Sequence, residues 1–170
     1  MLSEIARKQL TKAGWYEGRC IDISKYENAY NRLGLELFSA AKKFLSEFGD
    51  LTINDQTVFQ YHDLTGVMHK EIHTSTSCID VAYCGTDPQI IERTGKKVIR
   101  IGAFDHCEIY ISISEDGMFY ANWYNYGLVA ENTEQFWNEY YGEVYGRATW
   151  DDIAEGRGRK MLKSNHKDYV

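Results

Sequence analysis

The sequence predicts an α+β fold, with N-terminal helices and a C-terminal helix packed on a mainly antiparallel, meandering β-sheet. Two observations carry this prediction. The first 50 residues contain three helical patterns, and residues 51–124 are rich in β-branched and aromatic side chains separated by turn residues. Because helical and strand patterns are segregated along the chain, they indicate α+β rather than alternating α/β architecture.

Three helices are predicted before residue 50. The first covers residues 3–13 and ends at Gly14, and the second covers residues 25–33 and ends at Gly34. The third has the clearest helical period, with apolar residues at i, i+3, i+4, i+7, i+8 and i+11, and Gly49 caps it. These apolar residues are Leu37, Ala40, Ala41, Phe44, Leu45 and Phe48.

Strands are predicted after these three helices, and a further helix is predicted after the strands. Strands are predicted at residues 51–53, 57–61, 72–79 and 98–101, with a hairpin within 107–124. Residues 87–97 contain the single proline, Pro88, and predict a turn and a short helix. The pair Asn132 and Gln135 resembles a capping box that begins the last helix. One face of that helix is expected to carry Phe136, Trp137, Tyr140, Tyr141 and Val144.

The hairpin pattern also predicts its register. A three-residue loop, with Gly117 in the left-handed region, keeps one face apolar, whereas a two-residue loop mixes the faces. The resulting pairs are Ile113 with Phe119, Ile111 with Ala121 and Ile109 with Trp123. The opposite face is polar and rich in tyrosine, which suits solvent or a partner protein. It collects Glu108, Tyr110, Ser112, Tyr120, Asn122 and Tyr124.

Composition limits the classes of function. A chain of 170 residues indicates one domain, which we expect at residues 1–146, followed by a part-helical extension at 147–170. The net charge is −6, divided into −8 on residues 1–146 and +2 on the extension. An acidic body argues against direct binding of nucleic acid and favours a basic protein partner.

The expected compartment is the cytoplasm. The N-terminus lacks the continuous apolar stretch of a signal peptide, and no window reaches the length of a membrane span. Four scattered cysteines without a Cys-x-x-Cys pair are then expected to be reduced thiols. They are Cys20, Cys78, Cys84 and Cys107.

No segment reaches the level of a catalytic signature. His69 and His73 have metal-site spacing on a helix, but Lys70 occupies the position where a zinc protease has glutamate. Their flanks are strand-like, so no metal and no cofactor are predicted. Asp105-His106-Cys107 is expected to begin a strand with a free, inward-facing cysteine. His106 could not activate Cys107 directly there, because adjacent strand residues point to opposite faces.

Several ordered segments resemble the third clade of the SUKH superfamily of bacterial immunity proteins, over roughly residues 10–146. Asp50 departs from the family pattern, which usually has a second glycine there. The N-terminal segments are Ala13-Gly14-Trp15, Gly18-Arg19, Phe44-Leu45-Ser46-Glu47-Phe48-Gly49-Asp50-Leu51 and His73-Thr74-Ser75. The later ones are Ile101-Gly102, Ile113-Ser114-Glu115-Asp116-Gly117-Met118-Phe119-Tyr120 and Gly127-Leu128-Val129-Ala130.

The resemblance implies an α+β protein without enzymatic activity that neutralises a cognate polymorphic toxin, often a nuclease, delivered between bacteria. Combined with the acidic body, it predicts that this chain occludes the toxin's active site, as a monomer or weak dimer. The predicted contacts are Asp105, Glu108, Tyr110, Tyr120, Asn122 and Tyr124. Two alternatives remain: a metal-dependent hydrolase using His62, His69 and His73, and a regulatory module that binds something other than a toxin.

Overall fold

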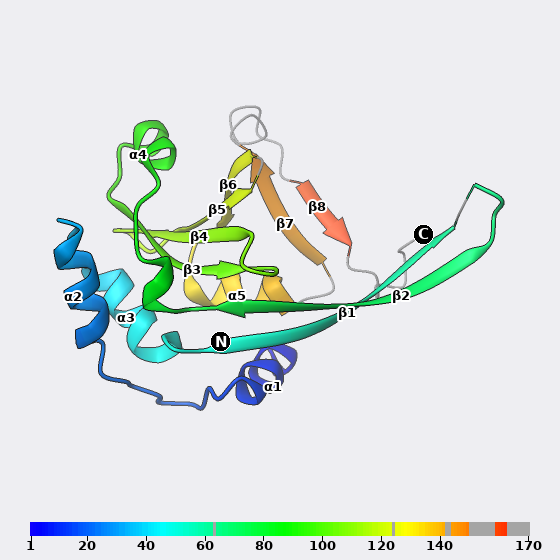
Figure 1. The fold of residues 1–170 in the computed structure, drawn as a ribbon, viewed down its shortest axis with the longest axis horizontal. Coiled ribbons are helices and arrows are strands. Elements are labelled where there is room, and N and C mark those ends of the chain that lie inside the picture. The colour runs from blue at the N-terminus through cyan, green and yellow to red at the C-terminus, as the bar shows by residue number, and fades with distance from the viewer. Residues whose placement is uncertain (63, 124, 142–143, 150–158, 163–170) are drawn as a thin grey trace.

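The computed structural model describes residues 1–62, 64–123, 125–141, 144–149 and 159–162 (Figure 1). Its helices are α1 (Glu4–Lys12), α2 (Ser24–Arg32), α3 (Ser39–Phe48), the 3-10 helix η1 (Val81–Tyr83), α4 (Pro88–Thr94) and α5 (Thr133–Tyr141). Its strands are β1 (Thr52–His62), β2 (Met68–Cys78), β3 (Val98–Phe104), β4 (Ile109–Ser114), β5 (Phe119–Trp123), β6 (Asn125–Ala130), β7 (Val144–Thr149) and β8 (Arg159–Leu162).

The strands lie side by side in chain order from β1 to β8, and each pairs antiparallel with the next. This confirms the predicted α+β fold with a meandering sheet. The prediction missed β6. In the extension, the described residues form parts of β7 and β8 rather than a helix, and β7 crosses the predicted boundary at residue 146.

The predicted helices are present, and side-chain hydrogen bonds cap the starts of α1 and α5. The Ser3 hydroxyl accepts from the Ala6 N–H at 3.2 Å, and the Asn132 carboxamide accepts from the Gln135 N–H at 2.9 Å. The last helix ends at Tyr141, so placing Val144 on its face was wrong: Val144 begins β7.

The main core lies between the sheet and helices α1, α2, α3 and α5. Its centre is aromatic: the Phe44 ring lies 5.3 Å from Phe119 and 6.2 Å from Trp137, measured between ring centroids. Phe119 in turn stacks on Phe136 at 4.7 Å. These rings join one strand to two helices that are distant in sequence, so they fix the position of α3 and α5 on the sheet.

The predicted hairpin register is confirmed at Ile111 with Ala121 and Ile113 with Phe119, whereas Ile109 with Trp123 is not among the observed pairs. Gly117 has φ 86°, as the three-residue loop requires. Cys107 does not begin a strand. Asp105, His106 and Cys107 all have left-handed backbone (φ 52–63°) in the turn between β3 and β4.

The second face of the sheet is partly covered by the chain itself. Ile90 of α4 packs with Val98 and Tyr120 in a separate small core. Beside them, the buried Asp87 carboxylate accepts from the Ser112 hydroxyl at 2.7 Å and from the Asn122 amide at 2.9 Å. Since a buried carboxylate requires such donors, these bonds hold the start of α4 against β4 and β5.

The turn after α3 joins three elements: α3, β1 and β2. Gly49 is the C-cap, yet the residue in the left-handed region is Asp50, with φ 62°, at the position where the family pattern has a second glycine. The Asp50 N–H donates to the Ile79 carbonyl at 2.7 Å, and the Ile79 N–H donates to the Leu51 carbonyl at 3.0 Å. These bonds direct the chain from α3 into β1 beside the end of β2.

Gly49→Ala is expected to destabilise the protein by about 2–3 kcal/mol through overpacking. An added Cβ would lie 2.4 Å from the Leu45 carbonyl oxygen and 3.1 Å from the Tyr26 ring. Gly34→Ala is the control, since its site (φ 69°) has open space and a cost of about 1 kcal/mol. Urea denaturation measures both, and equal losses would contradict the steric argument.

Asp87→Ala is expected to cost roughly 3 kcal/mol, because it leaves the Ser112 and Asn122 donors without their acceptor and removes the carboxylate that lies 3.6 Å from the Arg100 guanidinium. Ser112→Ala removes one donor and should cost about 1 kcal/mol. Chemical denaturation gives both values. A loss for Asp87→Ala no larger than that for Ser112→Ala would refute the network.

Candidate docking surface

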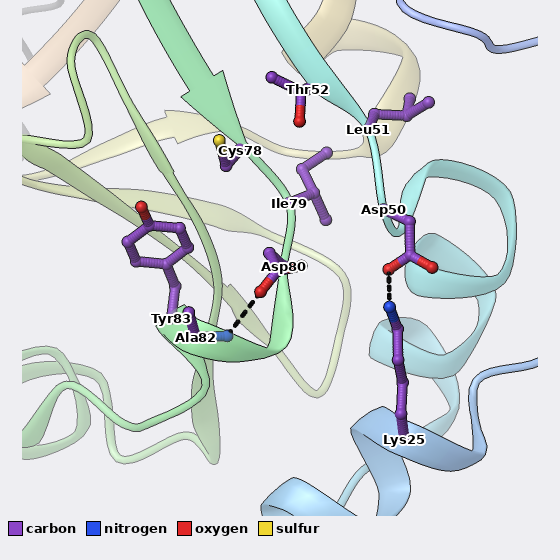
Figure 2. Close-up of a pocket in the computed structure, with 9 residues that line it drawn as sticks. All are labelled: Lys25, Asp50, Leu51, Thr52, Cys78, Ile79, Asp80, Ala82 and Tyr83. Carbon is purple, nitrogen blue, oxygen red and sulfur yellow. Dashed lines mark hydrogen bonds and ion pairs between the residues drawn. The ribbon is translucent and has the colours of Figure 1, made fainter.

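A cavity of about 400 Å³ opens where α2, the turn after α3, the bases of β1 and β2, and η1 meet. Figure 2 shows the side chains around it. Polar and charged groups predominate among them; Ala82 is the exposed apolar residue, while Leu51 and Ile79 are buried. The lining residues are Lys25, Asp50, Leu51, Thr52, Cys78, Ile79, Asp80, Ala82 and Tyr83.

An ion pair lies at one end of this cavity. The Lys25 ammonium lies 2.6 Å from the Asp50 carboxylate, which is also 2.7 Å from the buried Tyr26 hydroxyl (Figure 2 shows the ion pair). Partial burial alone would raise the pKa of Asp50. Hydrogen bonds from Lys25 and Tyr26 and the charges of Lys25 and Arg19 outweigh it, so the pKa is lowered. Asp50 is therefore ionised at neutral pH.

The other end of the cavity is formed by Tyr83 and the free thiol of Cys78. A hydrogen bond with Cys107, with burial second, raises the pKa of Tyr83 to about 12. Burial and the neighbouring Cys107 raise the pKa of Cys78. A thiol with a raised pKa is protonated at neutral pH and is a poor nucleophile. These groups therefore supply hydrogen bonds and contact area rather than reactivity.

Three of the predicted contact residues continue this surface. Asp105 and Glu108 are exposed in the turn that carries Cys107, and the Tyr110 ring lies 6.5 Å from Tyr83 between centroids. We define the docking surface as the charged and aromatic residues of this region. They are Lys25, Asp50, Asp80, Tyr83, Asp105, Glu108 and Tyr110. With four carboxylates against the Lys25 ammonium and the Arg100 guanidinium that lies over the Tyr110 ring, the docking surface is acidic.

The other predicted contacts lie elsewhere. Tyr120 is 2% exposed beneath α4, so it does not lie on the surface as predicted. Asn122 donates to Asp87, and Tyr124 lies outside the described residues. Strand alternation assigned all of them to one face, but it gave no sign that the segment with Asp87 and Ile90 folds back over part of that face.

Sequence reasoning did not assign Lys25, Asp50, Asp80 or Tyr83 to a site. Asp50 carried the one local signal, as the residue in place of a family glycine. Asp80 caps η1 by accepting from the Ala82 N–H at 2.9 Å (Figure 2). These residues come from three separate stretches of chain, so their proximity has no signature in spacing.

The histidines of the alternative hypothesis lie along the β1–β2 hairpin. The register pairs His62 with Met68, Tyr61 with His69 and Thr57 with His73. Four residues along a strand separate the backbones of His69 and His73 by about 13 Å. No group of three or more His, Cys, Asp or Glu suited to a metal ion occurs within the part of the chain that the structure describes.

Among the described helices, none is long and apolar enough to span a membrane.

Asp50→Asn is expected to lower the free energy of unfolding at pH 7 by at most about 1 kcal/mol, since Asp50 and Lys25 are 37% and 46% exposed. Because the pKa of Asp50 is lowered on folding, its ionised form stabilises the protein above roughly pH 4. The difference from wild type should shrink as the pH falls through that lowered pKa.

Denaturant titrations between pH 7 and pH 3 measure this difference. Glu92→Gln, which removes an exposed carboxylate on α4, is the matched control. An Asp50→Asn deficit that stays constant or grows in acid would contradict the assigned ion pair.

The comparisons with known proteins agree with the resemblance seen in the sequence. The model of the SUKH-3 immunity protein family matches residues 2–141, which include every element from α1 to α5. No curated protein and no solved structure matches the chain. Because the family model covers most of the chain, this chain belongs to the SUKH-3 family of immunity proteins.

Proposed function

We propose that this chain binds and neutralises a cognate secreted bacterial toxin, a nuclease, by covering its active site with the docking surface. Membership in an immunity protein family supports toxin binding. The acidic docking surface supports a nuclease as the toxin, because a nuclease active site is surrounded by the basic groups that bind phosphates.

The observation that carries the proposal is that a cavity lined by two carboxylates and Tyr83 lies beside Tyr110, whose ring is 6.5 Å from Tyr83 between centroids. Asp105 and Glu108 are exposed beside Tyr110, and Asp50 and Asp80 lie at the cavity. Carboxylates attract a basic partner and accelerate its encounter. Tyrosine rings add rigid contact area with a polar tip, which suits interfaces.

The cavity also suits an inserted cationic side chain. The Arg100 guanidinium already lies 4.6 Å from the centre of the Tyr110 ring, so one face of this ring is occupied by a cation. Tyr83 and Asp80 offer a second aromatic ring and a carboxylate at the cavity wall. A lysine or arginine of the toxin placed there would no longer be available to bind nucleic acid.

The mechanism requires no catalytic step by this chain. Binding alone blocks the toxin when the complex buries the groove that would hold its substrate. Since the toxin acts on nucleic acid inside the cell, the proposed complex forms in the cytoplasm. It contains the toxin and either one copy of this chain or a weak dimer.

The experiment co-expresses this chain with the C-terminal domain of the toxin encoded beside its gene. The expected result is survival of the host and a complex that co-elutes in size-exclusion chromatography. No complex and no protection would overturn the proposal. A metal-free preparation whose melting is unchanged by a chelator would leave the hydrolase alternative without support.

Asp105→Lys combined with Glu108→Lys is expected to weaken toxin binding about tenfold or more, mainly through slower association with a smaller salt dependence. Glu92→Lys combined with Glu131→Lys makes the same change in net charge at exposed sites on α4 and before α5. Stopped-flow kinetics with an inactivated toxin domain measures both pairs, and equal effects would indicate net charge alone.

A further inference from the structure

The hairpin of β1 and β2 projects from the sheet. The two strands form eleven consecutive pairs, from Thr52 with Cys78 to His62 with Met68. By contrast, β2 is paired with β3 at one position among the described residues, Cys78 with Ala103. Figure 1 shows the hairpin extending past the other strands and the helices. We name residues 52–78 the arm.

The base of the arm is anchored to the body. The Tyr140 hydroxyl of α5 donates to the Asp55 carboxylate at 2.8 Å and lies 3.3 Å from the Ser77 hydroxyl. Ser77 also accepts from the Asp105 N–H at 3.1 Å. Beyond the pair of Asp55 with Ser75, seven further pairs continue outward. At about 3.3 Å per residue, this distal part of the arm is roughly 20 Å long.

The tip of the arm is apolar. Leu64, Val67 and Met68 are 108%, 55% and 60% exposed. Three of the seven large hydrophobic side chains exposed in the described residues are thus gathered within five positions. A two-stranded ribbon is only marginally stable alone in water, and a cluster of exposed apolar groups marks a binding site.

We propose that the arm is a second contact element for the toxin, whose tip inserts into an apolar recess beside the toxin's basic groove. The inference rests on the proposed function. The arm is continuous with the docking surface, because Thr52 and Cys78 at its base line the cavity. A partner seated on the docking surface therefore meets the base of the arm, from which the distal part extends outward.

The net charge of the arm indicates which kind of partner binds it. Residues 52–78 contain three acidic residues and one lysine, so the arm complements a basic protein and repels a second copy of itself. The other large exposed apolar side chains in the described residues all lie within residues 1–33, one on α1 and the rest outside the helices and strands. They are Met1, Ile5, Tyr16 and Leu33. These observations favour a toxin over a second copy of this chain.

The test compares Leu64→Ser combined with Met68→Ser against Ile5→Ser combined with Leu33→Ser, which removes exposed apolar groups away from the arm. The probe is the inactivated toxin domain encoded beside the gene, with binding measured by calorimetry. We expect the arm variant to bind at least tenfold more weakly, the control within about twofold, and both to melt as wild type does.

Equal affinity of the arm variant and wild type would overturn the role of the arm and leave the proposed function intact. Failure of wild type to bind the toxin would overturn the proposed function and the arm's role together. Light scattering tests whether the arm instead binds a second copy of this chain. A wild-type dimer that becomes monomeric in the arm variant would overturn the proposal, because the partner of the arm would then be a second copy rather than the toxin.

Discussion

The turn after α3 is the constraint from which the rest of this structure follows. The buried Tyr26 hydroxyl accepts from the Asp50 N–H at 2.9 Å and lies 2.9 Å from the Ile79 carbonyl oxygen. One side chain of α2 thereby fixes the end of α3, the start of β1 and the end of β2. Because that turn sets β1 beside β2, it positions the arm, and because it exposes the Asp50 carboxylate, it forms one wall of the docking surface.

The two faces of the sheet are covered differently. One face buries the aromatic cluster of Phe44, Phe119 and Trp137 under the helices, which supplies most of the apolar burial. The other face is divided by the chain's own segment from η1 to α4: Asp87 and Ile90 cover one part, while Tyr83 and Tyr110 border the acidic part. Since the docking surface shares no side chains with the aromatic core, substitutions there can alter the partner without removing core packing.

The acidic docking surface and the apolar tip of the arm contribute to different stages of binding. Exposed carboxylates such as Asp105 and Glu108 attract a basic protein from a distance, but each exposed ion pair adds little affinity because water screens it. Apolar side chains such as Leu64 and Met68 act at contact range, and burying them contributes affinity that salt does not weaken. A surface that combines both is suited to fast capture followed by slow release.

The sequence by itself determined the local structure. The apolar period of α3, the cap at Asn132 and the alternation of Ile111 and Ile113 predicted helices, ends and a register that the structure confirms, because each depends on neighbours within a few residues. Tertiary structure decided the site. It buried Tyr120 under α4, brought Asp50, Asp80 and Tyr83 to one cavity, and extended β1 and β2 into an arm. These outcomes depend on contacts between segments far apart in the chain, and local periodicity contains no information about which distant segment will cover a given face.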